Sequence, residues 1–195
     1  MADSRRTEMT KLLFRTALIE LIQEKPFHKI SVKEICEQAD LNRTTFYLHY
    51  SDLNQLLGDI VSQLEKDTSE HFSSTTGEVD DIENLTRHLD YIKENKKIYK
   101  ALMSSNLDDD IRMGIFKNML SGVSERVPEF GSKIENPYTY TFMIFGCGSV
   151  VSQWISNGFD MDTASLARLL YDLCAKPRER ISPRIGYRTR KTVSR

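Results

Sequence analysis

Residues 30–50 read ISVKEICEQADLNRTTFYLHY, and this stretch decides the fold because the ends of two short helices can be placed in it. Ser31 and Glu34 have the spacing of a capping box, in which each side chain satisfies a backbone amide at the start of a helix. The first helix therefore begins directly after Ser31, and a turn then leads to Asn42, a residue favoured before a helix. The second helix is expected from Arg43 to about Tyr50. Two helices of this length joined by a short turn have the dimensions of a helix-turn-helix.

The second of these helices has one face suited to a protein core and one suited to DNA. Phe46 and Tyr50 stand one helical turn apart and are expected to face inward. On the opposite side, Arg43 offers two donors that match the acceptor pair of guanine in the major groove. The further contacts expected from this face are Thr44 with a base edge or a thymine methyl, and Tyr47 and His49 with phosphates. The alternative is a helical hairpin inside a bundle, with Arg43 and Tyr47 merely solvated.

Apolar stripes in the remaining sequence predict an all-α protein. Phe14, Ala17, Leu18, Leu21 and Ile22 follow helical spacing in the first segment, and Pro26 ends that helix. The same spacing recurs within residues 53–64, 82–92, 111–123 and 166–173, whereas no stretch shows the alternation of a β-strand. We expect about nine helices in all. They would form a compact N-terminal unit up to about residue 50, which contains the helix-turn-helix, and a larger helical bundle after it.

The charges divide the chain into three parts. Residues 1–50 contain eight Lys or Arg against seven Asp or Glu, residues 51–175 contain 11 against 20, and residues 176–195 contain eight against one. We therefore expect an acidic body at 51–175 and a basic tail at 176–195, after the helix-turn-helix DNA-binding domain at 1–50. The tail either attracts DNA without regard to sequence or is a solvated, partly disordered end.

Several motifs in and after the helix-turn-helix resemble the TetR/AcrR family of bacterial transcriptional regulators. The motifs are Ser31-Val32-Lys33-Glu34-Ile35-Cys36, Ala39, Thr45-Phe46-Tyr47, His49-Tyr50 and Leu56-Leu57. The resemblance implies an all-helical homodimer whose three N-terminal helices bind a palindromic operator in double-stranded DNA. It also implies that a fourth helix links them to a C-terminal helical bundle, an effector-binding and dimerisation domain at 51–175 whose last two helices pair with those of a partner. By position it implies that Arg43 and Thr44 read bases and that Leu48 lies near them. It also implies that Thr45, Tyr47 and His49 hold the DNA backbone, and Ser31 is placed in the same DNA-binding set.

The sequence departs from this family pattern at two positions. Asp40 stands where a turn glycine is usual, and Leu53 stands where a phosphate-binding lysine is common. Arg5, Arg6 and Lys11 could restore part of the lost attraction for DNA. Leu53 also favours an alternative function, in which a regulator-like protein acts mainly through protein–protein contacts and has weak or no operator binding of its own.

The segment from Asn136 to Phe159 carries no charged residue. A membrane span is one interpretation of such a run, but several hydroxyl and amide side chains and two glycines make it too polar. A helix buried by its own body and by a partner explains the composition better. Together with the stripe Leu166, Leu169, Leu170 and Leu173, this helix predicts a homodimer held by residues 138–155 and 162–174.

An effector pocket, where one exists, is expected between the helices of the C-terminal bundle. Its candidate lining consists of aromatic and flexible side chains: Tyr91, Tyr99, Met103, Phe116, Met119, Phe142, Phe145 and Trp154. For any one of them, ordinary core packing is the default interpretation. The ligand expected in such a pocket is small and apolar.

The sequence gives little support to an enzyme, a metal site or a cofactor. His28, His49, His71 and His88 lack the pairing of a helical zinc site. Cys36, Cys147 and Cys174 match neither a disulfide framework nor a metal knuckle. The charged N-terminus has no apolar signal core, so we expect a cytoplasmic location.

The function expected is that of a sequence-specific DNA-binding regulator, in the form of a ligand-responsive repressor.

Overall fold

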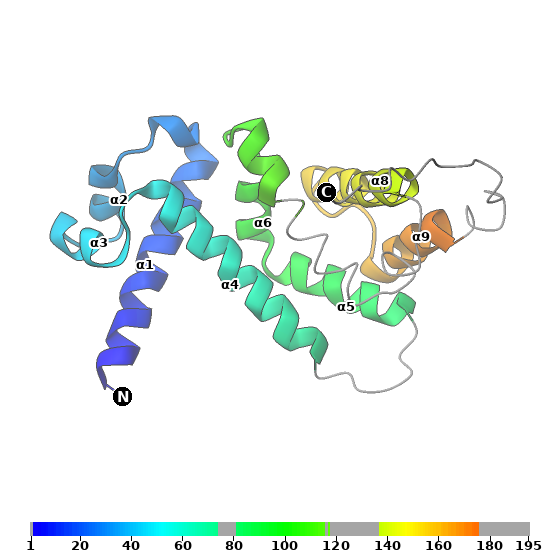
Figure 1. Ribbon diagram of the computed structural model, residues 1–195, viewed down its shortest axis with the longest axis horizontal. Helices are drawn as coiled ribbons and strands as arrows, with labels where there is room; N and C mark the ends of the chain where they lie inside the picture. The colour runs from blue at the N-terminus through cyan, green and yellow to red at the C-terminus, as the bar shows by residue number, and fades with distance from the viewer. Residues whose placement is uncertain (1, 74–80, 116, 118–136, 176–195) are drawn as a thin grey trace, which may run out of the picture.

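The computed structural model describes residues 2–73, 81–115, 117 and 137–175, and these contain helices but no β-strand (Figure 1). In chain order the elements are α1 (Ala2–Glu24), the 3₁₀ helix η1 (Phe27–Lys29), α2 (Val32–Gln38), α3 (Arg43–His49), α4 (Leu53–Ser73), α5 (Asp81–Glu94), α6 (Lys96–Leu102), α8 (Pro137–Ser156) and α9 (Thr163–Ala175). Residues 109–115 form a further helical stretch. The all-α class is confirmed. The basic tail at 176–195 lies outside the described residues.

The first three helices form a unit that we call the head. The apolar stripe expected on α1 is buried, and the ring of Phe14 lies at its centre. That ring meets Phe46 of α3 edge to face, with centroids 5.3 Å apart and planes at 82°. It also meets Tyr50, at a centroid distance of 6.2 Å. Such aromatic pairs stabilise a core beyond their buried area, and here they hold α3 against α1.

Helix α4 connects the head to the rest of the molecule. Asp52 caps its start, because the backbone amide of Gln55 donates to the Asp52 carboxylate at 2.9 Å. One face of α4 is buried along Leu56, Leu57, Ile60, Val61 and Leu64, as the apolar spacing predicts. In Figure 1 the helix crosses from beside α1 to α5, and it packs against both of them. Helix α4 therefore contacts both an earlier helix of the chain, α1, and the helix that follows it, α5.

The elements from α5 to α9 form a second unit that we call the body. Helix α5 packs along α9, and α6 contacts both α8 and α1. Helix α8 ends at Ser156 and is followed by Gly158 and Phe159, which have positive φ angles of 79° and 67°. The Phe159 amide donates to the carbonyl of Trp154 at 2.9 Å, and the two rings meet edge to face at 4.7 Å. This is the Schellman arrangement, in which a left-handed residue and an apolar contact end a helix.

Head and body are joined by Asn106, in the loop after α6. Its side-chain amide donates to the carbonyl of Ile22 at 2.8 Å, which satisfies an acceptor near the C-terminal end of α1. Its backbone carbonyl accepts from the amide of Phe27 in η1, also at 2.8 Å. One loop of the body thus holds the segment that leads from α1 to α2.

A membrane span is one interpretation of the uncharged sequence that forms α8. In the part of the chain that the structure describes, no helix is long and apolar enough to cross a membrane.

Candidate nucleic-acid interface

Helix α2 begins at the capping box that the sequence predicts. The Ser31 hydroxyl accepts from the Glu34 amide at 3.3 Å, and the Glu34 carboxylate accepts from the Ser31 amide at 2.9 Å. The same hydroxyl donates to the Glu34 carboxylate at 2.8 Å. Ser31 is therefore fully engaged at the start of the helix. Its membership of the DNA-binding set remains a prediction, and a phosphate contact would have to replace one of these bonds.

The turn between α2 and α3 contains the unusual residue Asp40. Its φ of 53° lies in the left-handed region, which favours glycine and which aspartate tolerates better than most residues. The Leu41 amide donates to the carbonyl of Cys36 at 2.9 Å, and the Asp40 amide to that of Glu37 at 3.3 Å. These two bonds make a Schellman motif. The turn keeps its geometry without the glycine, at some conformational cost.

Helix α3 has the two faces that the sequence predicts. Asn42 caps it by accepting from the Thr45 amide at 2.7 Å. Phe46 is fully buried and Tyr50 nearly so. The opposite face is exposed and consists of Arg43, Thr44, Tyr47 and Leu48. Leu48 is the most open of the large apolar side chains described, at 76% exposure. We call these four residues the α3 face.

Thr45 and His49 lie at the edge of the α3 face and are half-buried. The Thr45 hydroxyl donates to the carbonyl oxygen of the Asn42 side chain at 3.0 Å, so its proton is already used. The His49 ring lies beside Tyr50, with centroids 6.3 Å apart. Their predicted contacts with the DNA backbone remain predictions, and they are less accessible than the α3 face.

A polar network that the sequence does not reveal holds the end of α3. The Asp59 carboxylate on α4 accepts from the Tyr50 hydroxyl at 2.7 Å and from the Arg15 guanidinium on α1 at 2.7 Å. Burial raises the pKa of Asp59, but these two hydrogen bonds outweigh it and leave the pKa lowered. Burial and the bond to Asp59 raise the pKa of Tyr50. At neutral pH the acceptor is therefore charged and the donor is neutral, and the three helices are joined through one carboxylate.

The charges beside the α3 face are mixed. Lys25 forms an ion pair with Glu34, and Lys33 approaches Glu37 at 3.6 Å. Hydrogen bonds from Lys25 and Ser31 lower the pKa of Glu34 to about 2. Two lysines of the head are thus partly neutralised. Arg43 has no ion-pair partner among the described residues and stays exposed.

Leu53 does not supply the phosphate contact that a lysine there would offer. Its side chain is half-buried and packs against the buried core at the start of α4. Arg5 and Arg6 are exposed near the beginning of α1, and Lys11 is half-buried. These cations remain available for attraction to a polyanion.

The structure brings together some of the residues expected around an effector. The rings of Tyr91 and Tyr99 meet edge to face, with centroids 6.4 Å apart, and Tyr99 is buried. The Tyr91 hydroxyl donates to Asp67 of α4 at 3.4 Å. Trp154 is also buried, but its indole N–H donates to the backbone carbonyl of Met161 at 2.8 Å. Trp154 therefore stabilises the turn after α8. None of the contacts described for it joins it to Tyr91.

The other expected lining residues are dispersed. Met103 and Phe145 are half-buried. Phe142 is 75% exposed, so in the single chain it does not lie between the helices of the body, and its place in a ligand site remains a prediction. Because α8 has no charged residue, its sequence does not indicate which side faces the body. Phe116 and Met119 lie outside the described residues.

Both helices predicted at a dimer interface expose large apolar side chains. On α8 these are Tyr138 and Phe142, and on α9 they are Leu169 and Leu173. Val150 of α8 is half-buried. A single chain therefore leaves part of the apolar surface of both helices in contact with solvent.

Sequence reasoning missed a groove of about 360 Å³ between α4 and residues 109–115. We call it the α4 groove. None of the six expected effector residues that the structure describes lines it. Its aliphatic residues were recognised only as helix stripes, since spacing within a helix does not show where two stripes fail to meet. Among the described residues, no group of three His, Cys, Asp or Glu side chains is placed to hold a metal ion.

Two family models match this chain. Residues 15–60 match a model described as bacterial regulatory proteins, tetR family. Residues 81–176 match a model described as a transcriptional regulator C-terminal region. The first match covers the helix-turn-helix and the start of α4, and the second covers the body.

Individual relatives are distant in sequence. The chain is 21% identical over 103 residues to the uncharacterized HTH-type transcriptional regulator YxbF of Bacillus subtilis (strain 168); this is 50% of the chain but only 27% of that relative. A TetR transcriptional regulator from Streptococcus agalactiae 2603V has a TM-score of 0.68 at 21% identity, covering 89% of this chain and 98% of that one. The dihydroxyacetone kinase operon activator DhaS has a TM-score of 0.54 at 20% identity, covering 87% and 96%. At these identities the solved structures show the shared fold.

Proposed function

The chain belongs to the tetR family of bacterial regulatory proteins, and we propose that it binds a two-fold symmetric operator as a homodimer and releases it when a small ligand binds. The observation that carries this proposal is the α3 face. Its four residues point outward from a helix whose other side is locked into the core of the head. An exposed helix of this kind fits the major groove of DNA.

Each residue of the α3 face has a proposed role. Arg43 lies in the first turn of α3 and contacts guanine, and Thr44 meets a neighbouring base edge. Tyr47 donates to a phosphate, which fixes the position of the helix without reading sequence. Leu48 has no hydrogen-bonding group, so its contact with a base is apolar and a thymine methyl is the feature it fits. Thr45, His49 and Ser31 are proposed backbone contacts at the edge.

The homodimer is proposed to form through α8 and α9. The exposed Phe142 and Leu169 support this, since a partner would cover apolar surface that one chain leaves open. Charged substitutions at Leu169 and Val150 should therefore give monomer or aggregate. Light scattering at micromolar concentration measures this, and a monomer for the unmodified chain would contradict the proposal.

The remaining proposals follow from binding to DNA. We place residues 1–50 as the DNA-binding domain, residues 51–175 as the effector-binding and dimerisation domain, and the protein in the cytoplasm. Residues 176–195 act as a nonspecific electrostatic element, because eight of them are Lys or Arg. Deleting them should lower the dependence of DNA affinity on salt without changing which sequence is preferred. A changed preference would contradict that role.

A second function is favoured by the charges beside the α3 face. Lys25 and Lys33 are paired with carboxylates, Asp40 adds a negative charge to the turn, and Leu53 replaces a possible phosphate contact. These features support a co-regulator that works mainly through another protein. The structurally similar DhaS is titled an operon activator, so release of a repressed operator is not the sole action among proteins of this fold.

A mobility-shift experiment separates the two functions. The purified chain is mixed with labelled DNA from upstream of its own coding sequence, at low and moderate salt. Operator binding predicts a shifted band that the same unlabelled DNA competes away and scrambled DNA does not. Half-sites should lie in successive major grooves, about 34–36 Å apart or a multiple of this distance. Equal competition by scrambled DNA would exclude operator reading and favour the co-regulator.

A further inference from the structure

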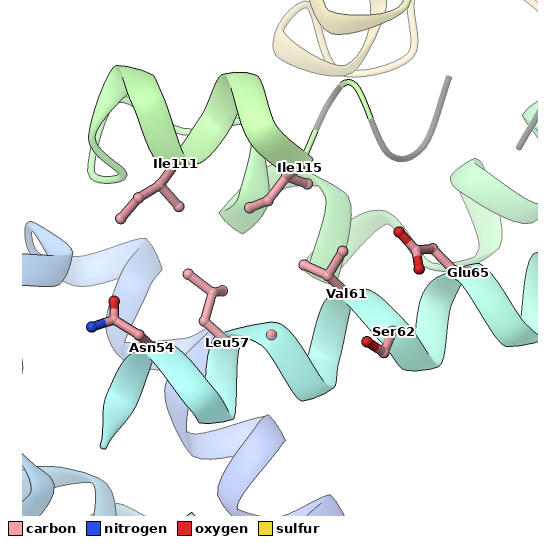
Figure 2. Close-up of a pocket in the computed structure, with 8 residues that line it drawn as sticks. Asn54, Leu57, Val61, Ser62, Glu65, Ile111 and Ile115 are labelled. Atoms are coloured by element: carbon pink, nitrogen blue, oxygen red, sulfur yellow. The ribbon is translucent and has the colours of Figure 1, made fainter. Parts of the chain in front are cut away.

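The α4 groove has an apolar centre formed by two facing helices (Figure 2). Leu57 and Val61 project from α4, and Ile111 and Ile115 project toward them from the opposite helix. Leu57, Val61 and Ile115 are buried, so their side chains form the floor of the groove, whose volume is about 360 Å³. A space of this size is within the range of small-ligand sites.

Gly58 helps to keep the groove open. It lies inside α4 and lines the groove between Leu57 and Val61. Its φ is not left-handed, and a Cβ added there would meet no atom within 4 Å. Glycine is less favourable than alanine inside a helix. Neither backbone conformation nor close packing requires glycine here, and its effect is to leave space in the groove.

The ends of the groove are polar. Figure 2 shows Glu65 beyond Val61 at one end, and Asn54 at the other. Neither side chain has a hydrogen-bond or ion-pair partner among the described residues. Glu65 is eight residues from Leu57, which is roughly 12 Å along a helix. The groove therefore offers a row of aliphatic contacts that leads to a single carboxylate.

The charge of the lining indicates which ligands fit. Among the described residues that line the groove, Glu65 is the one charged side chain, and none is a lysine or arginine. A ligand with a carboxylate or phosphate would meet repulsion and no cation. We propose that the α4 groove binds an amphiphilic organic cation, with its apolar part between the aliphatic walls and its protonated nitrogen facing Glu65.

Both walls of the groove are connected to the head. On α4, Asp59 follows Gly58 and holds Tyr50 at the end of α3. On the other wall, Arg112 donates to the carbonyl of Ser104 at 3.3 Å, in the loop whose Asn106 holds α1. A ligand that moves the two helices apart would shift the Asp59 contact with Tyr50 relative to the Asn106 contact with α1. Control of DNA binding by the ligand is the step that rests on the proposed function.

Calorimetric titration of the full chain without DNA tests the site directly. The probe is octylamine below its aggregation concentration, with octanol and octanoate as matched neutral and anionic probes. Saturable binding of one octylamine per chain, tighter than that of either other probe, is the expected result. No saturable octylamine binding, or octanoate binding as tight as octylamine binding, overturns the proposal.

Three variants locate the binding. Gly58→Leu fills the groove and should abolish octylamine binding without lowering the melting temperature, because the added side chain enters open space. Glu65→Gln should weaken octylamine binding about two- to fivefold, as for an exposed ion pair, and leave octanol binding unchanged. Glu94→Gln, an exposed carboxylate at the end of α5, is the control and should have no effect. Octylamine binding unchanged in Gly58→Leu would place the ligand elsewhere and overturn the proposal.

Failure of the site and failure of the proposed function give different results. When the chain shifts its upstream DNA but octylamine does not bind, the operator proposal stands and the groove proposal falls. When octylamine binds as described but no specific shift is seen, the groove proposal stands and the operator proposal falls. Where both hold, octylamine should lower operator affinity in the unmodified chain and not in Gly58→Leu.

Discussion

The head and the body expose apolar side chains for different reasons. In the head, Leu48 and Tyr47 project from α3 because the other side of that helix is fixed by Phe46 and by a local cap at Asn42. In the body, Phe142 projects from a helix without charged residues, and nothing within its sequence separates an inner from an outer side. The direction of a side chain follows from local sequence when a helix has two unlike faces. It depends on packing when the faces are alike.

The largest expected difference between the two regions is between Phe46→Ala and Phe142→Ala. Phe46 is fully buried, so its truncation should lower the free energy of unfolding by about 3–5 kcal/mol. Phe142→Ala should change it by less than about 0.5 kcal/mol in the monomer, but should make the melting temperature more dependent on protein concentration. Urea and thermal unfolding at two concentrations measure both. An equal decrease in the free energy of unfolding for the two variants would contradict the assigned difference between the head and the body.

Asp59→Asn tests the network that joins the helices of the head to α4. Removing the charge should cost about 1–3 kcal/mol at pH 7, because Arg15 and Tyr50 lose a charged acceptor. The pKa of Asp59 is lowered in the folded chain, so its contribution is present above the unfolded pKa of about 3.9 and is lost as pH falls through the folded pKa. The gap between variant and parent should therefore shrink in acid. Asp90→Asn on α5 is the exposed control, and a gap that stays constant with pH would contradict this role.

The α3 face is tested by comparing Arg43→Ala with Tyr47→Phe. Arg43→Ala should cost about 1–3 kcal/mol on the preferred operator and relax discrimination at one base pair. Tyr47→Phe should weaken binding to all sequences by similar amounts, since a phosphate contact carries no base information. Neither variant should alter the melting temperature, because both side chains are exposed. If neither variant changes the affinity for the operator, the co-regulator function is favoured.

Leu48 gives a finer test of the same face. Removing a thymine methyl by deoxyuridine substitution should cost the unmodified chain up to about 1 kcal/mol at one operator position. The Leu48→Ala variant should be much less sensitive to that substitution, because the apolar partner is already absent. Fluorescence anisotropy measures the affinity of both proteins for operators in which one thymine at a time is replaced by deoxyuridine. The difference between the proteins at each position is the coupling between Leu48 and that methyl group. Equal sensitivity of both proteins at every thymine would exclude an apolar base contact by Leu48.

The smallest expected effects are at the two left-handed turns. Asp40 and Gly158 follow α2 and α8 in equivalent Schellman positions, with φ of 53° and 79°. Asp40→Gly should stabilise the head by about 0.5 kcal/mol, since relief of backbone strain is partly offset by a more flexible unfolded chain. Gly158→Asp should destabilise the body by about 0.5–1 kcal/mol. Thermal melting of both variants compares them, and a stabilising Gly158→Asp would contradict the argument.

Much of the head could be predicted from the sequence. The start of α2 at Ser31, the start of α3 after Asn42 and the inward direction of Phe46 all follow from groups within one helical turn of each other. The outward direction of the α3 face follows from the same facts. The candidate DNA-binding residues could therefore be named before the fold was known, although the hydrogen bonds that the Ser31 and Thr45 hydroxyls donate could not.

The sequence by itself determined the all-helical class, the ends of the short helices and the two faces of α3, because caps and helical stripes act over three or four residues. Only the tertiary structure decided that Arg15 and Asp59 meet across 44 positions and that Asn106 reaches Ile22 across 84. It also decided that Phe142 faces outward and that α4 and residues 109–115 leave a groove between them. Such features depend on how helices pack, and the spacing of residues along one helix carries no information about the helix opposite.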